Sequence, residues 1–181
     1  LVKSGKIRHV GLSNETPWGI IKFLQTAKEN KLPDIVSVQN GYNLLNRVFD
    51  IANSEVSLRE QCGLLAYSPI AGGRLSGKYM SGKKPENARY TLWPKRFSRH
   101  NTERGELATA KYFETAKKYN ISLAALANAF VLSRPFVTSS IVGATSVQQL
   151  EENIDSTNLK LSKEILKEVN DIHLLDPNPC V

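Results

Sequence analysis

The chain has 181 residues, of which 41% are hydrophobic and 23% are charged, a balance typical of a globular domain that buries a core. This composition excludes intrinsic disorder, collagen-like repeats and a disulfide scaffold, because Cys62 and Cys180 are the only cysteines. The net charge of +7 is concentrated in residues 74–104, which hold nine basic and two acidic residues, so the remainder is neutral. This distribution favours a local anion site over an extended nucleic-acid-binding face.

Strands and helices alternate along the first third of the chain. An apolar run over residues 7–12 predicts a first strand, and Thr16 then caps a helix whose first position is a proline. A β-branched run over residues 35–39 predicts the second strand, and the pattern of residues 49–61 predicts a helix with one polar face. Residues 63–68 form the third predicted strand.

A long segment without a sustained hydrophobic period follows the third strand. Residues 74–104 contain two prolines, and a loop of this length inside a domain is usually functional. The remaining predicted elements are helices over residues 106–119 and 123–133, a strand over 139–142, a short helix ending near residue 153 and a final helix capped by Ser162. The pattern predicts one α/β domain over residues 1–181, with a basic loop at about 74–105.

Strands separated by helices predict a parallel sheet with right-handed crossovers, in which ligands bind at the carboxyl ends of the strands. Polar residues gather at these ends, namely Ser13, Asn14, Gln39, Asn40, Tyr67, Ser68 and Thr145. Each of them alone is explained by an ordinary turn or helix cap. Four strand ends that all carry polar side chains indicate one shared ligand-binding rim.

Four motifs in a fixed order resemble the aldo-keto reductases. They are residues 5–14, which end in Gly-Leu-Ser-Asn, and the segments 38–47, 67–79 and 143–153. These segments resemble the fifth to eighth strands of that family, in the branch that includes potassium-channel β subunits. The resemblance implies that the chain is the C-terminal half, strands five to eight, of a (β/α)8 TIM barrel with outer helices.

The resemblance also implies an NADPH site. The residues that would hold the nicotinamide carboxamide are Ser13, Asn14 and Gln39, whose amide and hydroxyl groups supply donors and acceptors. Tyr67 would stack on the nicotinamide ring. The pyrophosphate cradle would consist of Ser68, Pro69, Ile70, Ala71, Gly72 and Gly73, continued by Ser76 and Lys78, with Arg74 and Arg89 as further cations.

The fourth motif would bind the adenosine part of the cofactor. Thr145 and Gln149, in the motif that begins at Gly143, match positions at the 2′-phosphate, and Glu152 and Asn153 match positions that pair with adenine. The best-known members carry Lys-Ser before this helix and Arg at the position of Gln149, and this chain carries neither. A preference for NADPH over NADH would therefore depend on charge from the basic loop.

The catalytic residues of the family lie outside the resemblance. Its Asp, Tyr, Lys and His belong to the first four strands, so we assign no catalytic residue here and expect this chain alone to be inactive. The full protein would use NADPH to reduce the carbonyl group of aldehydes or ketones. The alternative is a non-catalytic regulatory β subunit of a voltage-gated potassium channel.

The remaining expectations concern location and partners. The chain begins without Met and without a secretory segment, which suggests a fragment of a cytoplasmic protein, and its longest apolar run is too short to insert into a membrane. We expect a small carbonyl substrate, no nucleic acid and no metal, because the three histidines lack ligand spacing. Half a barrel would leave two open sheet edges, so the missing N-terminal half-barrel or self-association should cover them.

Three aromatic residues lie outside the motifs. Trp18, on the first predicted helix, is expected to serve packing. Trp93 and Phe97 lie in the basic loop, where their rings would either fill space as a structural plug or form the wall of a substrate pocket.

Overall fold

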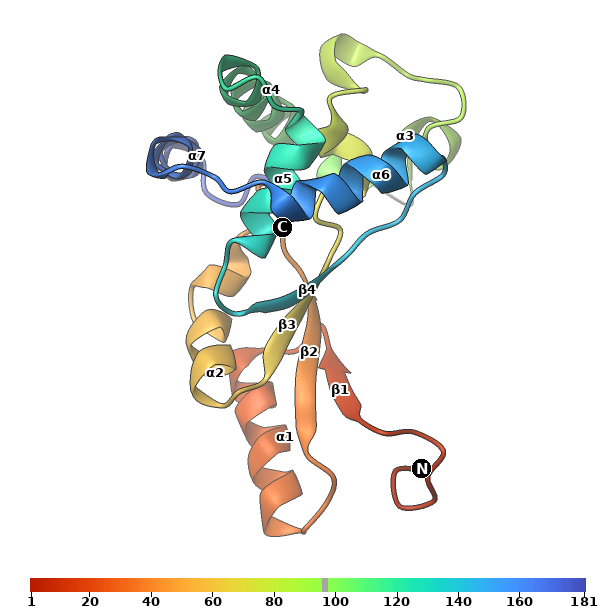
Figure 1. Ribbon diagram of the computed structural model, residues 1–181, viewed down its shortest axis with the longest axis vertical. Coiled ribbons are helices and arrows are strands. Elements are labelled where there is room, and N and C mark those ends of the chain that lie inside the picture. Colours follow the sequence, from red (N-terminus) through yellow and green to blue (C-terminus); the bar gives the residue numbers. More distant parts are fainter. Residues whose placement is uncertain (96–97) are drawn as a thin grey trace.

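Four parallel strands form one sheet, in the same order as in the sequence (Figure 1). The computed structural model describes residues 1–95 and 98–181. The strands are β1 (Val10–Ser13), β2 (Ile35–Gly41), β3 (Gly63–Tyr67) and β4 (Val137–Ile141). All neighbouring pairs are parallel, and helices connect them, as the alternation in the sequence predicted.

Helix α1 (Pro17–Glu29) begins where the sequence predicted. The Thr16 hydroxyl accepts a hydrogen bond from the backbone N–H of Gly19 at 3.1 Å. The face that contains Ile20 is buried, whereas Trp18 is 75% exposed. Trp18 precedes Ile20 by two residues, which places it about 200° away around the helix. The expectation that Trp18 packs in the core is therefore wrong for this chain.

Helix α2 (Asn53–Arg59) begins later than predicted. The residues before it form a separate 3-10 turn, η1 (Val48–Asp50). The Asp50 carboxylate accepts hydrogen bonds from the Tyr42 hydroxyl at 2.7 Å and from Arg47 Nε at 2.8 Å. These bonds hold the turn against the core, so the predicted single helix is broken in its first turn.

The basic segment, for which the sequence predicted a long loop, contains several short helical pieces. The pieces are η2 (Ala71–Ser76), η3 (Met80–Gly82), α3 (Arg89–Leu92) and η4 (Ser98–His100). Inside the segment, the rings of Tyr79 and Tyr90 are buried with their centroids 4.7 Å apart. Such short turns leave no hydrophobic period in the sequence. Trp93 is 54% exposed, and Phe97 lies outside the described residues.

The later helices follow the predicted pattern. They are α4 (Glu103–Lys118), α5 (Leu123–Leu132), α6 (Val147–Asp155), the turn η5 (Ser156–Asn158) and α7 (Lys163–Leu175). Both predicted caps are confirmed, because the Ser122 hydroxyl accepts from Ala125 N and the Ser162 hydroxyl accepts from Ile165 N. Over residues 1–95 and 98–181, no helix has the length and apolar character needed to cross a membrane.

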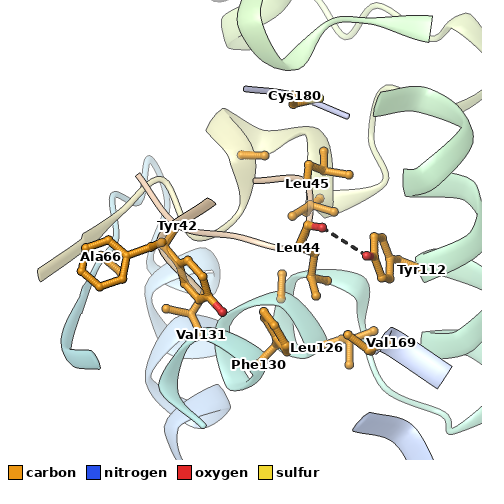
Figure 2. Packing of buried hydrophobic residues seen from close by; sticks show 14 of the residues in the cluster. Tyr42, Leu44, Leu45, Ala66, Tyr112, Leu126, Phe130, Val131, Val169 and Cys180 are labelled. Atoms are coloured by element: carbon orange, nitrogen blue, oxygen red, sulfur yellow. Dashed lines mark hydrogen bonds between the residues drawn. The ribbon is translucent and has the colours of Figure 1, made fainter. Parts of the chain in front are cut away.

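The hydrophobic core gathers around α5. Phe130 and Val131 of α5 are fully buried, and the ring of Tyr42 stacks on Phe130 with 6.0 Å between centroids. Figure 2 shows Tyr112 of α4 beside the same core, where its hydroxyl donates to the carbonyl oxygen of Leu44 at 3.1 Å. The core therefore joins the loop after β2 to the helices that follow the basic segment.

The sheet ends at β1 and β4, and no further strand of the described chain pairs with either edge. Figure 1 shows α1 and α2 along one side of the sheet and only the N-terminal segment beyond β1. Val36, Ile141 and Val142 are each about 40% exposed. A parallel four-stranded sheet with outer helices is consistent with part of a (β/α) barrel.

Candidate cofactor-binding site

Three strand ends bring polar side chains to one rim. Asn14 directly follows β1 with a φ of 54°, and its N–H donates to the carbonyl oxygen of Gln39 at 3.0 Å. Ser13 and Gln39 are partners in the register of β1 and β2. The hydroxyl of Tyr67, at the end of β3, donates to Asn14 Oδ1 at 2.8 Å. A phenol ring beside amide groups suits a planar ligand that carries hydrogen-bonding groups.

The chain after β3 makes a left-handed turn. Four of its residues have positive φ angles: Ser68 (56°), Ala71 (49°), Gly72 (64°) and Gly73 (106°). The turn contains all six residues predicted for the pyrophosphate cradle, namely Ser68, Pro69, Ile70, Ala71, Gly72 and Gly73. A Cβ on Gly72 would lie 2.9 Å from the Tyr90 hydroxyl, so this position has no room for a side chain. Within the turn, the Ala71 N–H donates to the carbonyl oxygen of Ser68 at 2.8 Å and the Gly73 N–H to that of Ile70 at 2.9 Å. The glycines therefore allow a tight turn in which these two N–H groups already have partners.

Two predicted polar residues adjoin this turn, and a third is farther along the chain. The Ser76 hydroxyl donates to the carbonyl oxygen of Gly73 at 2.7 Å. Lys78 lies beside the same glycine, since a Cβ there would be 3.3 Å from Lys78 Cε. Arg89 is exposed at the start of α3. Lys78 is therefore an exposed cation beside Gly73.

Arg74 has a different position from the one expected. It is only 3% exposed, and its guanidinium donates to the carbonyl oxygen of His100 at 3.1 Å and to Asn101 Oδ1. The Glu106 carboxylate lies 4.0 Å away. These partners make Arg74 a cation that holds the basic segment together. The expectation that it adds free charge for the cofactor is wrong, because its charge is used inside the fold.

His100 is buried behind the cradle. Desolvation, followed by the nearby guanidinium groups of Arg99 and Arg74, lowers the pKa of His100 to about 4. Neither ring nitrogen has a hydrogen-bond partner among the described residues. The imidazole is therefore neutral at pH 7 and fills space beneath Gly72.

Arg99 is a residue that the sequence did not single out. Its guanidinium carbon lies 5.8 Å from the centroid of the Tyr67 ring, within the range of a cation–π contact. The signal in the sequence was the excess of basic residues in the segment. That excess does not identify which basic side chain packs near the rim, because Arg99 and Tyr67 are 32 positions apart in the sequence.

The fourth motif divides into two parts. Gly143, Thr145 and Gln149 are exposed in the turn between β4 and α6 and in its first residues. The backbone N–H of Thr145 donates to Gln149 Oε1 at 3.0 Å. These residues form an exposed uncharged polar surface.

The other two residues of this motif face α5. Glu152 accepts a hydrogen bond from the Ser122 hydroxyl at 2.5 Å, and Asn153 Oδ1 accepts from Asn128 Nδ2 at 2.8 Å. Asn153 is 9% exposed. Glu152 also lines a cavity of about 530 Å³ between α5 and α6. The structure therefore separates these two side chains from the exposed part of the motif.

Comparison with known proteins identifies the family of the chain. A family model described as the aldo/keto reductase family matches residues 1–173. The chain belongs to this family. Aldo/keto reductases are oxidoreductases that generally use NAD(P)H, and the parallel sheet with outer helices fits part of their barrel.

Several curated aldo/keto reductases and related proteins are similar to the chain. Protein tas of Escherichia coli K12 is 44% identical over 178 residues, which cover 98% of this chain and 51% of that protein. An aldo-keto reductase of Babesia bovis is 39% identical, covering 96% of this chain and 63% of that protein. The L-glyceraldehyde 3-phosphate reductase of Escherichia coli O157:H7 is 35% identical, covering 97% and 51%. The chain thus spans between about half and two thirds of the length of these relatives.

Proposed function

We propose that the chain forms the NADPH-binding half, strands five to eight, of an aldo/keto reductase that reduces aldehydes or ketones to alcohols. The observation that carries this proposal is the rim where Asn14, Gln39 and Tyr67 meet, beside the left-handed turn at Gly72 and Gly73. The family match and the reductase names of two relatives support it.

Each part of the site suits one part of a nicotinamide dinucleotide. The amides of Asn14 and Gln39 and the hydroxyl of Ser13 can bond both the oxygen and the nitrogen of a carboxamide. The Tyr67 ring offers a flat face that decides which side of the nicotinamide is open to substrate. When bound, the nicotinamide supplies a hydride for a carbonyl carbon. The acid that protonates the carbonyl oxygen lies outside these 181 residues in this proposal.

The preference for NADPH over NADH rests on residues away from the rim. Thr145 and Gln149 carry no charge, so the cation that neutralises a 2′-phosphate would come from the basic segment, with Arg89 as the candidate because Lys78 lies beside Gly73 of the cradle. Exposed cations act through screened charge. We therefore expect NADPH to bind more tightly than NADH, by a factor that shrinks as salt rises.

The name of one relative suggests which substrates to test first. One of them is named for L-glyceraldehyde 3-phosphate, so small aldehydes with and without a phosphate are the first compounds to assay. The alternative, a potassium-channel β subunit, receives no support from the relatives cited above, none of which is named for a channel. Two unpaired buried thiols, Cys62 and Cys180, fit the reducing cytoplasm that we propose as its location.

The sheet edges imply a further partner. β1 and β4 are unpaired on their outer sides within the described chain, and half-exposed apolar residues such as Val36 and Ile141 lie on this sheet. We propose that the other half-barrel, or a second copy of the chain in its absence, covers these edges. Light scattering should then give the isolated chain a mass above 20.1 kDa. A stable monomer without dye-binding apolar surface would contradict this part.

The central experiment separates cofactor binding from catalysis. The 181-residue chain is titrated with NADPH and with NADH by calorimetry, and then assayed for NADPH consumption with a reactive aromatic aldehyde. We expect saturable binding, tighter for NADPH, and no consumption. Absence of binding would overturn the cofactor site, whereas consumption that co-purifies with the chain would overturn the assignment of the acid to another segment.

A further inference from the structure

A second cavity lies within the basic segment. It has a volume of about 310 Å³ and opens between η3, α3 and the start of α4. Its polar lining comprises Arg74, Lys83, Lys84, Thr91, Asn101 and Glu106. Lys78 and Arg89, the cations proposed above for the cofactor, are not among the described residues that line it. The cavity is therefore a separate feature from the rim and the cradle.

The charge of this lining is positive. Glu106 lies 4.0 Å from the buried Arg74 guanidinium and offsets it. Lys83 and Lys84 are exposed at the mouth, and neither pairs with a carboxylate in the described chain. Two ammonium groups at one opening attract an anion with more than one negative charge.

A neutral donor complements the lysines. Asn101 Oδ1 accepts from Arg74, which leaves the Asn101 amide hydrogens available to a ligand. Thr91 also belongs to the lining, but its hydroxyl is buried away from solvent, so a ligand in the cavity does not reach it.

The opposite wall is apolar. The buried rings of Tyr79 and Tyr90 and the ring of Pro94 line it. A ligand therefore meets positive charge and donors on one side and carbon on the other. The volume lies at the lower end for small-molecule sites, so the ligand is small.

We propose that this cavity binds a small organic phosphate monoester at a site distinct from the cofactor. The three terminal oxygens of a phosphate can accept from both lysines and from Asn101 at once, and its charge of up to about −2 matches the two ammonium groups, whereas a single carboxylate carries a charge of only about −1. The short carbon chain of the ester contacts the tyrosine and proline wall.

Trp93 provides an optical probe for this site. The chain has two tryptophans, and Trp93 adjoins Pro94 of the cavity wall whereas Trp18 lies on α1. In a Trp18→Phe chain, the emission of Trp93 is followed during titration with glycerol 3-phosphate at constant ionic strength. Inorganic phosphate, succinate and glycerol are titrated in parallel, which separates the ester from free phosphate, from a dicarboxylate and from the carbon body alone.

We expect saturable binding of glycerol 3-phosphate, weaker binding of inorganic phosphate and no binding of succinate. Lys83→Ala/Lys84→Ala should weaken binding at least about tenfold. The control Lys22→Ala/Lys28→Ala removes the same charge from α1 and should leave binding unchanged. If the alanine pair loosens the segment, Lys83→Gln/Lys84→Gln removes the charge while keeping most of the side-chain length.

Four results would overturn the proposal. A linear response shared with sodium chloride would mean general screening, and binding retained by both lysine-pair variants would place the anion elsewhere. Displacement of glycerol 3-phosphate by NADPH would make the cavity part of the cofactor site. Succinate that binds as tightly as the ester would refute the choice of phosphate.

Discussion

Two polar clusters of similar composition have opposite surroundings. Around Asp50, the side chains of Tyr42 and Arg47 are buried and bonded to the carboxylate at 2.7 and 2.8 Å. At the rim, Asn14 and Tyr67 share one bond of 2.8 Å and remain open to solvent in part. The first cluster satisfies its own groups inside the core, whereas the second leaves donors, acceptors and a ring face for a ligand.

The buried cluster has a structural consequence beyond its own bonds. Arg47 Nη1 donates to Asn170 Oδ1 of α7 at 2.9 Å, and its backbone N–H donates to Asn178 Oδ1 at 2.6 Å. Burial, followed by the Asp50 carboxylate, raises the pKa of the Tyr42 hydroxyl well above its usual range. The cluster therefore ties the C-terminal residues to the loop after β2 and holds Tyr42 as a neutral donor.

The largest effect should come from breaking the buried cluster. Arg47→Met removes the hydrogen bonds of the guanidinium to Asp50 and Asn170 and leaves the partly buried Asp50 carboxylate with Arg134 at 3.7 Å as its remaining cation. The free energy of unfolding should fall by about 3 kcal/mol. Urea unfolding measures this change. Arg59→Met is the matched control, because the exposed pair of Arg59 with Glu55 should contribute less than about 1 kcal/mol. Similar losses of unfolding free energy in the two variants would contradict the claim that the buried cluster around Asp50 stabilises the fold more than an exposed ion pair does.

The next effect depends on pH. The pKa of His100 is about 4 in the folded chain and near 6.5 when unfolded, so the unfolded state binds the proton more readily. Stability from the neutral imidazole is complete above pH 6.5 and is lost as pH falls toward 4, by up to about 3 kcal/mol. His100→Gln should flatten this part of the stability profile in urea unfolding. Parallel profiles for the two chains would contradict the burial of this histidine.

Two glycines with similar backbone conformations allow a controlled test of the predicted pyrophosphate cradle. Gly72 and Gly82 both have positive φ angles, 64° and 72°, but only a Cβ on Gly72 meets another group within 4 Å. Each alanine variant should lose about 1 kcal/mol of stability through left-handed strain, and Gly72→Ala should lose more because its Cβ also meets the Tyr90 hydroxyl. Only Gly72→Ala should also weaken NADPH binding, by about tenfold or more, because its Cβ crowds the turn. Equal affinities in calorimetry would place the pyrophosphate elsewhere.

The smallest effect on stability belongs to the rim. Tyr67→Phe removes one partly exposed hydrogen bond, so unfolding should change by less than about 0.5 kcal/mol and NADPH affinity by about twofold to threefold. Tyr67→Leu also removes the ring face and should weaken NADPH binding about tenfold. Titrations of both variants by calorimetry separate the hydroxyl from the ring. A leucine variant that binds like the wild type would show that the ring does not stack on the cofactor.

The sequence by itself determined the elements that depend on local chemistry. Hydrophobic periods located the four strands and the longer helices, and the hydroxyls of Thr16, Ser122 and Ser162 cap helices where predicted. Parallel order followed from the alternation, and with it the meeting of Asn14, Gln39 and Tyr67 at one edge. These features follow from neighbours a few positions apart or from the handedness of strand connections.

The tertiary structure decided everything that depends on residues distant in the sequence. The turn at Asp50 breaks a predicted helix because Tyr42 and Arg47 bond its carboxylate. Arg74 is buried and Arg99 reaches the Tyr67 ring, although both belong to the same basic segment. The sequence shows that a residue is charged, but not where its side chain lies. The surrounding fold determines whether the charged group is solvated, paired with another group in the interior or placed over an aromatic ring.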